Sequence, residues 1–147
     1  MKNRSMKTLK LFTFLCIVTL YSSCDNGESD NPLDFQLGQS FELAFGQSAD
    51  CTCDNLTVTF AEVLEDSRCP SDVVCIWEGQ ARIKLNVQAP DGQHPLELIS
   101  RAGHSDLARD TLDNLVYELL DVSPYPVSTR PIDEDDYRIE LIVKELE

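Results

Sequence analysis

Apolar and polar residues alternate with a period of two along much of the chain from Leu33 onward, and no segment there keeps a helical apolar period over three turns. The clearest case is residues 81–89, in which Ile83, Leu85 and Val87 alternate with polar or charged side chains. Such alternation is typical of a strand with one buried face. The same pattern predicts strands over residues 56–61 and 137–144, and weaker strands over 40–45, 95–101 and 115–122.

Turn residues and prolines indicate how these strands connect. The run Pro90-Asp91-Gly92-Gln93 predicts an antiparallel hairpin that pairs residues 81–89 with 94–101. Residues 105–114 fit either a helical turn or an irregular crossing between sheets. Residues 123–136 are predicted to form a long loop, because each proline there removes a backbone donor from a ladder.

These elements predict an all-β domain over residues 35–147. Six or seven short antiparallel strands without a crossover helix favour an immunoglobulin-like sandwich, with a small barrel as the alternative. The apolar pair Leu119-Leu120 predicts a bulge or a bend in its strand.

The first 23 residues have the pattern of an export signal. Four basic residues precede an apolar run over residues 11–21, which is too short to span a bilayer. Leu20-Tyr21-Ser22-Ser23-Cys24 resembles a bacterial lipobox, which predicts a lipoprotein signal peptide over residues 1–23 and lipidation of Cys24. The alternative is ordinary signal cleavage that leaves Cys24 as a free thiol. Lipidation predicts a protein that is anchored to the membrane and does not span it.

The net charge of the chain excludes one class of partner. The 147 residues hold 12 basic and 26 acidic side chains, for a net charge of −14. Because no basic patch is available to neutralise phosphates, nucleic acid is excluded as a partner. Residues 24–34 are interpreted as an acidic, flexible tether. Its acidic run resembles the signal that sends some lipoproteins of the Bacteroidota to the cell surface, so the outer membrane or the cell surface is the expected location.

Four further cysteines are expected to meet an oxidising compartment. They can pair in more than one way. The pairing favoured here joins Cys69 to Cys75 across a short loop, and Cys51 to Cys53 as a surface staple. The alternative for Cys51 and Cys53 is a redox-active pair or a Cu(I) site. The C-x-C and C-x5-C spacings lack zinc knuckles, so a cysteine zinc site is excluded.

The segment Asp66-Ser67-Arg68-Cys69-Pro70-Ser71-Asp72-Val73-Val74-Cys75-Ile76-Trp77-Glu78-Gly79 is the most distinctive in the chain. It resembles the D-S-R-C-P-x-x-V-x-C-x-W-x-G motif of small bacterial lipoproteins that are frequent in the Bacteroidota. The resemblance implies an envelope location and a β fold, and it implies no catalytic residue. Glu78 stands where the motif is expected to have a small residue.

The motif is interpreted as a stapled corner, in which Trp77 caps the core and Gly79 permits a bend. Asp66 and Arg68 are expected to form an exposed pair that contributes about 0 to 1 kcal/mol. The alternative is a recognition surface built on Arg68 and Trp77.

Little else in the sequence suggests chemistry. His94 and His104 are predicted to be solvated, and no nucleophile elbow, phosphate loop or metalloprotease helix is present in the sequence. We therefore expect no enzyme, no catalytic residue, no cofactor and no metal. The acidic run 133–136 is interpreted as a solvated loop, with a weak calcium site as the alternative. Asp110-Thr111-Leu112 resembles an acceptor for O-glycosylation at Thr111.

The sequence therefore predicts a lipid-anchored envelope or surface protein with a structural or binding role and a protein or glycan partner. One alternative is a thiol redox or copper-handling protein that uses Cys51 and Cys53. A second alternative is a small protease inhibitor that uses the loop over residues 123–131.

Overall fold

The computed structural model describes residues 33–53 and 55–146. The predicted signal peptide over residues 1–23, the lipidation site Cys24 and the tether up to residue 32 lie outside the described residues. The last two residues assigned to the tether, Leu33 and Asp34, belong to the first strand.

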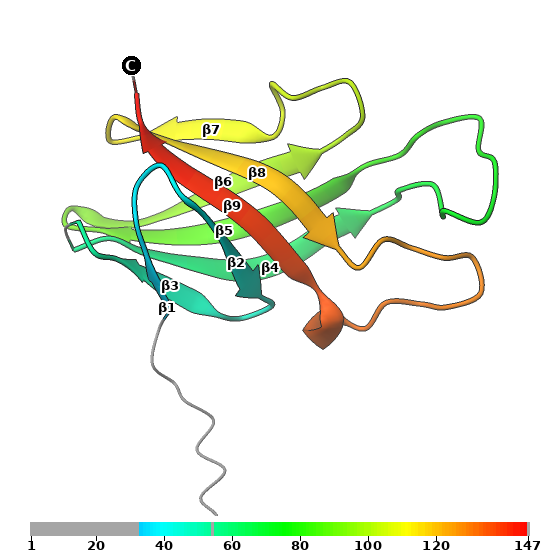
Figure 1. The fold of residues 1–147 in the computed structure, drawn as a ribbon, viewed down its shortest axis with the longest axis horizontal. Helices are drawn as coiled ribbons and strands as arrows, with labels where there is room; N and C mark the ends of the chain where they lie inside the picture. The colour runs from blue at the N-terminus through cyan, green and yellow to red at the C-terminus, as the bar shows by residue number, and fades with distance from the viewer. Residues whose placement is uncertain (1–32, 54, 147) are drawn as a thin grey trace, which may run out of the picture. The chain divides into compact units, whose positions relative to one another are not determined.

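The described residues form two β-sheets packed face to face (Figure 1). The fold is all-β, and the strands do not close into a barrel. The strands are β1 (Leu33–Phe35), β2 (Ser40–Ala44), β3 (Ser48–Cys51), β4 (Thr57–Asp66), β5 (Ala81–Ala89), β6 (Gly92–Ser100), β7 (Arg109–Leu112), β8 (Leu115–Ser123) and β9 (Arg138–Glu145), with one 3-10 turn, η1 (Glu134–Asp136), before β9.

The strand order is simpler than that of an immunoglobulin domain. One sheet has the order β1-β3-β4-β5-β6 and the other β2-β9-β8-β7, so most neighbours in space are also neighbours in sequence. The order differs from the ABED and CFG sheets of an immunoglobulin domain, which place the non-consecutive strands B and E, and C and F, side by side. The prediction of six or seven strands, all antiparallel, is also wrong, because the described residues form nine strands and β1 runs parallel to β3.

The alternation seen in the sequence places the core between the sheets. In β5 the residues Ile83, Leu85 and Val87 are fully buried, as the pattern predicts. They pack against buried side chains from the other sheet, among them Leu119, Ile139, Leu141 and Val143. The 20 buried residues of this cluster form one continuous core.

The predicted hairpin between residues 81–89 and 94–101 is present, with Ala89 paired to Gly92 across the turn. The predicted irregularity at Leu119-Leu120 is a register shift between Leu119 and Asp121. The segment over residues 105–114 was predicted only in part: the chain crosses irregularly between the sheets at residues 101–108, but residues 109–112 form strand β7. The loop predicted over 123–136 is present after β8 ends at Ser123, and η1 forms its last turn.

Register fixes which end of the sandwich each segment occupies. Leu33 in β1 pairs with Ala49, which pairs with Val58 near the start of β4. From there β4 runs to Asp66 at the opposite end of the sheet. None of the described helical segments is long and apolar enough to cross a membrane.

Candidate functional site

Two loops lie side by side at the end of the sandwich where β4 and β8 finish (Figure 1). Residues 69–79 connect β4 to β5, and residues 124–131 follow β8. The amide of Ser71 donates a hydrogen bond to the carbonyl of Pro126 at 3.0 Å. Ser128 donates from its amide to Asp72 at 2.8 Å and from its hydroxyl to the other carboxylate oxygen. We refer to residues 69–79 and 124–131 together as the two-loop tip.

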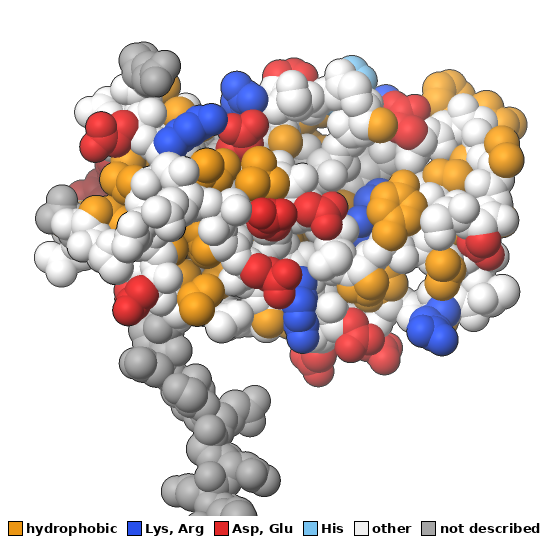
Figure 2. Space-filling view, viewed as in Figure 1, with side chains coloured by type: hydrophobic (Ala, Val, Ile, Leu, Met, Phe, Trp, Pro, Cys, Tyr) orange, Lys and Arg blue, Asp and Glu red, His pale blue; other side chains and the backbone are white. Residues whose placement is uncertain are grey.

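The two-loop tip exposes apolar side chains that a folded domain usually buries. Val74 is 100% exposed, Ile76 93% and Trp77 78%. Val73, Tyr125 and Val127 are also exposed, so six of the nine large exposed hydrophobic residues in the described part of the chain lie on these two loops. Figure 2 shows hydrophobic side chains gathered at this end of the molecule.

Arg68 holds the two loops together from beneath. Its side chain is buried and forms a bidentate pair with Asp66, at 2.8 Å to one carboxylate oxygen and 2.7 Å to the other. The guanidinium also donates to the carbonyl of Val122 and, at 2.9 Å, to the carbonyl of Pro124. Its carbon Cζ lies 5.0 Å from the centre of the Tyr125 ring, within range of a cation–π interaction. Arg68 therefore links the end of β4 to the loop after β8.

The partners of Asp66 keep it ionised in this buried position. Burial opposes ionisation, but the hydrogen bonds from Arg68 and Tyr137 outweigh it and hold the pKa of Asp66 below its ordinary value. The Tyr137 hydroxyl donates to Asp66 at 2.9 Å. Burial, together with this bond to a carboxylate, raises the pKa of Tyr137 to about 12. The side chains of Asp66, Arg68 and Tyr137 thus form one charged network under the tip.

The backbone of the first loop is closed at its base. Cys69 is disulfide-bonded to Cys75, and the Cys69 amide donates to the Glu78 carbonyl at 3.0 Å. Gly79 has a φ of +67°, and a Cβ atom there would lie 1.8 Å from the carbonyl oxygen of Ser67. Only glycine fits this position, as the predicted bend requires. The loop is therefore braced at both ends although its middle is exposed.

Carboxylates at the tip are engaged by neighbours. Hydrogen bonds from the Ser128 hydroxyl and amide hold the pKa of Asp72 below its ordinary value. The pKa of Glu78 is lowered by its own backbone amide first and by Arg101, whose Nε lies 3.1 Å from the carboxylate, second. Glu78 therefore has a structural partner where the motif is expected to have a small residue.

Two expectations about the motif are wrong. Trp77 does not cap the core, because the loop that carries it projects beyond the ends of the sheets and leaves the ring exposed. Arg68 does not form an exposed pair and is not itself on a recognition surface, because its side chain is only 6% exposed. The exposure of Val73, Val74 and Ile76 was not predicted, because it depends on the path of the loop. The apolar pair Val73-Val74 inside a short disulfide loop was the available signal.

The second disulfide lies at the opposite end of β4. Cys51 is bonded to Cys53, which matches the favoured pairing. Cys53 is exposed, and both cysteines line a hollow of about 440 Å³ together with Asp50, Leu56 and Gln88. This bridge is accessible to a reductant or a partner protein from solvent.

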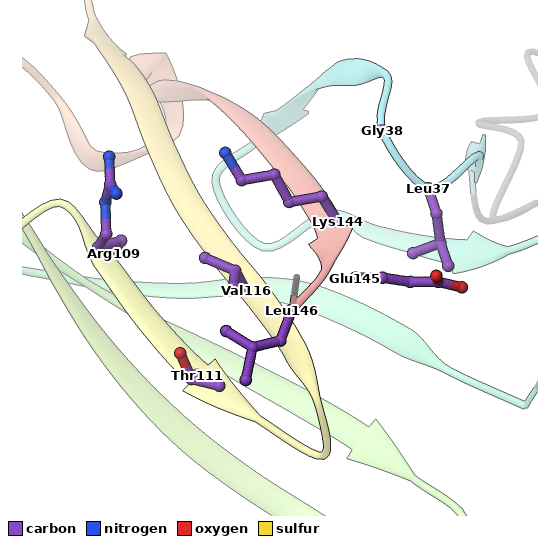
Figure 3. A pocket seen from close by; sticks show the side chains of 8 residues that line it. All are labelled: Leu37, Gly38, Arg109, Thr111, Val116, Lys144, Glu145 and Leu146. Carbon is purple, nitrogen blue, oxygen red and sulfur yellow. The ribbon is translucent and has the colours of Figure 1, made fainter.

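Thr111 lies on β7, the edge strand of its sheet, and is exposed. It borders a hollow of about 760 Å³ on the outer face, with Val116 and Leu146 as apolar neighbours (Figure 3). Arg109 and Lys144 also border this hollow, but both pair with Glu118, at 2.9 and 2.8 Å. The hydrogen bond from Lys144 is the main reason that the pKa of Glu118 is lowered. Glycosylation of Thr111 stays a prediction.

The remaining candidates are placed as follows. The acidic run 133–136 forms η1 and its cap, and all four side chains are exposed. His104 is exposed, as predicted. The prediction for His94 is wrong, because it is half-buried and its Nε2 lies 3.1 Å from Asp91. The sequence shows that His94 follows a turn. It does not show the strand register that pairs His94 with Val87 and directs the ring inward.

Comparison with protein families, curated proteins and solved structures found no match to this chain. The resemblance of residues 66–79 to the lipoprotein motif therefore stays a prediction from the sequence.

Proposed function

We propose that the protein is a non-enzymatic, lipid-anchored domain of the bacterial cell envelope or cell surface that binds a protein partner through the two-loop tip. The observation that carries this proposal is the group of six exposed apolar side chains on two braced loops. The lipid anchor is supported by the lipobox-like sequence that ends at Cys24.

Exposed apolar groups at the tip favour binding over a purely structural role. Contiguous apolar patches are uncommon on monomeric domains and mark interaction sites. Tryptophan and tyrosine dominate binding energy at interfaces, and the tip has Trp77 and Tyr125. Because the disulfide, Arg68 and Asp72 already order both loops, binding costs little further conformational entropy.

Charge favours a protein over a lipid surface as the partner. Without residues 1–23, which hold four of the 12 basic residues and no acidic ones, the chain has a net charge of −18. Such a charge repels anionic headgroups. A protein surface with an apolar hollow and a basic rim complements both the tip and the domain.

Photo-crosslinking in intact cells tests the binding proposal. A photoreactive amino acid is placed at Val74 in the tip and, as a control, at Leu120, which is also exposed but lies in β8. We expect a discrete protein adduct from position 74 and none from position 120. The adduct should disappear in Trp77→Ala, whose thermal stability should stay unchanged because the ring is exposed.

Other outcomes would overturn the proposal. Adducts only with lipid, the same adducts from both positions, or an adduct that survives Trp77→Ala would show that the tip does not select a protein. Once the partner is identified, Trp77→Ala should weaken the measured affinity by at least about tenfold, as expected for an interface hot spot.

The anchor is tested separately. Radiolabelled palmitate should enter the wild-type protein and not Cys24→Ala. Equal labelling of both proteins would overturn the lipid anchor without affecting the tip.

A second candidate function is thiol redox or copper handling by Cys51 and Cys53. The exposure of Cys53 and the hollow beside the disulfide favour it. Two readily reduced thiols with tight Cu(I) binding, lost in Cys51→Ser and kept in Cys69→Ser/Cys75→Ser, would support this function. Inhibition of secreted proteases tests the case in which the partner is a protease and the loop over residues 123–131 contacts it.

A further inference from the structure

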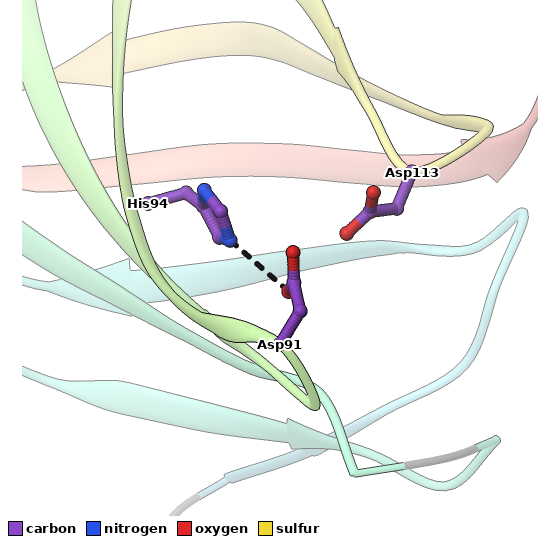
Figure 4. Close-up of side chains that lie close together, drawn as sticks. All are labelled: Asp91, His94 and Asp113. Carbon is purple, nitrogen blue, oxygen red and sulfur yellow. Dashed lines mark hydrogen bonds and ion pairs between the residues drawn. The ribbon is translucent and has the colours of Figure 1, made fainter.

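Three side chains with metal-binding groups meet at the edge of the sandwich (Figure 4). Asp91 lies in the turn between β5 and β6, His94 lies in β6, and Asp113 lies in the turn between β7 and β8. One ligand atom from each residue lies within 4.8 Å of those from the other two. Because β6 and β7 belong to different sheets, the cluster joins the two layers of the fold.

His94 occupies a position that alternation reserves for the core. It pairs with Val87, which is fully buried, and it shares a face of β6 with the buried Leu96 and Leu98. Its side chain is 33% exposed. A histidine therefore points between the sheets, toward two carboxylates, at a place where an apolar side chain would seal the edge.

The position of Asp113 is fixed by the tight hairpin turn that carries it. Asp113 and Asn114 have φ values of 51° and 61°, the conformation of a two-residue type I′ hairpin turn. The turn connects Leu112 directly to its partner Leu115. Asp113 is therefore placed by a closed hairpin.

The cluster has an excess of negative charge. Within the described part of the chain, no lysine or arginine forms an ion pair with Asp91 or Asp113, and the side chain that contacts Asp91 is that of His94. Two carboxylates this close repel each other. A divalent cation between them would offset this repulsion.

The donor set selects the type of cation. Calcium and magnesium prefer all-oxygen sites, whereas imidazole nitrogen together with carboxylate oxygen suits zinc. We propose that Asp91, His94 and Asp113 bind a zinc ion, with a further position open to water. This site is independent of the two-loop tip, which lies on other loops, and its test is independent of the proposed function.

Zinc binding to the untagged full chain tests the proposal, measured by competition with a chromophoric chelator. We expect one tightly bound zinc ion per chain and a higher melting temperature with zinc, because the ion binds only the folded state. His94→Ala, His94→Gln and Asp113→Asn should each weaken binding by at least about tenfold. The matched controls His104→Ala and Asp110→Asn should bind like the wild type.

Several results would overturn the zinc site. These are weak binding by the wild type, equal losses in His94→Gln and His104→Ala, or retained binding in a folded Asp113→Asn protein. Displacement of zinc by a modest excess of calcium would show an oxygen site that does not use the imidazole. Far-UV circular dichroism identifies variants that fail to fold, and the conclusion rests on those that do.

Discussion

At the scale of single residues, Arg68 has the largest structural role at the tip. Its guanidinium is enclosed by a carboxylate, two backbone carbonyls and an aromatic ring. A buried charge of this kind is favourable only while all its partners are present. The role of Arg68 is therefore to position the loops that carry Trp77 and Tyr125.

Replacing Arg68 should be costly for stability. Arg68→Ala leaves Asp66 without its counter-charge and two carbonyls without a donor, so we expect the free energy of unfolding to fall by about 3 to 5 kcal/mol. Urea unfolding at neutral pH measures this fall in the free energy of unfolding. The control is Arg101→Ala, which removes a partly exposed pair with Glu78 and should change the stability far less. Similar losses in the two variants would contradict the bracing role of Arg68.

The burial of Arg68 was beyond sequence reasoning for a physical reason. Its pairing with Asp66, two residues away, was predictable from spacing, but its carbonyl acceptors lie 54 and 56 residues further along the chain. Only the packing of one sheet on the other, which brings the ends of β4 and β8 together, places these carbonyls within reach of the guanidinium.

At the scale of elements, the loop after β4 depends on one glycine. Gly79→Ala would add a Cβ atom within 1.8 Å of the Ser67 carbonyl oxygen, in addition to the cost of a positive φ. We expect a loss of more than about 3 kcal/mol in the free energy of unfolding, or a displaced loop with changed Trp77 fluorescence. Chemical denaturation followed by fluorescence measures both.

Gly46→Ala provides the control for this prediction. Gly46 also has a positive φ, of +75°, but no atom lies within 4 Å of the position its Cβ would take. Its substitution should cost only the conformational strain, about 1 to 2 kcal/mol. Equal effects at both glycines would show that the contact with Ser67 is unimportant.

Strands with a long alternating face were predictable, and short ones were not. The pattern over residues 81–89 matches β5 at both ends. By contrast β1, β3 and β7 have three or four residues each and contribute one buried side chain or none, so their periodicity is invisible. These strands form because pairing with β3, β4 and β8, respectively, satisfies their backbone groups.

The zinc cluster was missed for a related reason. Asp91 and Asp113 come from two turns and His94 from β6, and the approach of these elements depends on the crossing between sheets at residues 101–108. The pair Asp113-Asn114 was an available signal, because both residue types tolerate positive φ. No sequence spacing indicates that this turn faces His94.

At the scale of the whole molecule, acid should destabilise the domain. The pKa values of Glu65, Asp66, Asp72, Glu78 and Glu118 lie below their ordinary values of 3.8 for aspartate and 4.5 for glutamate. These groups take up protons more readily in the unfolded chain. Their contribution to stability is therefore complete above about pH 6 and is lost as the pH falls below about 4.5.

Urea midpoints measured from pH 7 to pH 3 test this expectation. Asp66→Asn should be less stable than the wild type at pH 7 and should lose less stability between pH 5 and pH 3. Relief of repulsion among the 26 acidic residues acts in the opposite direction. A wild-type midpoint that rises below pH 4.5 would show that this repulsion outweighs the paired carboxylates.

The pairing of β1 with β3 fixes the point on the sheet at which the chain from the predicted anchor enters the domain. Leu33 enters beside Ala49 and Val58, whereas the tip begins beyond Asp66, eight residues or about 26 Å further along β4. If Cys24 is lipidated, the chain between it and Leu33 extends at most about 30 Å from the bilayer. The domain would then stay within a thin layer next to the membrane surface, and any partner of the tip would have to be present in that same layer of the envelope.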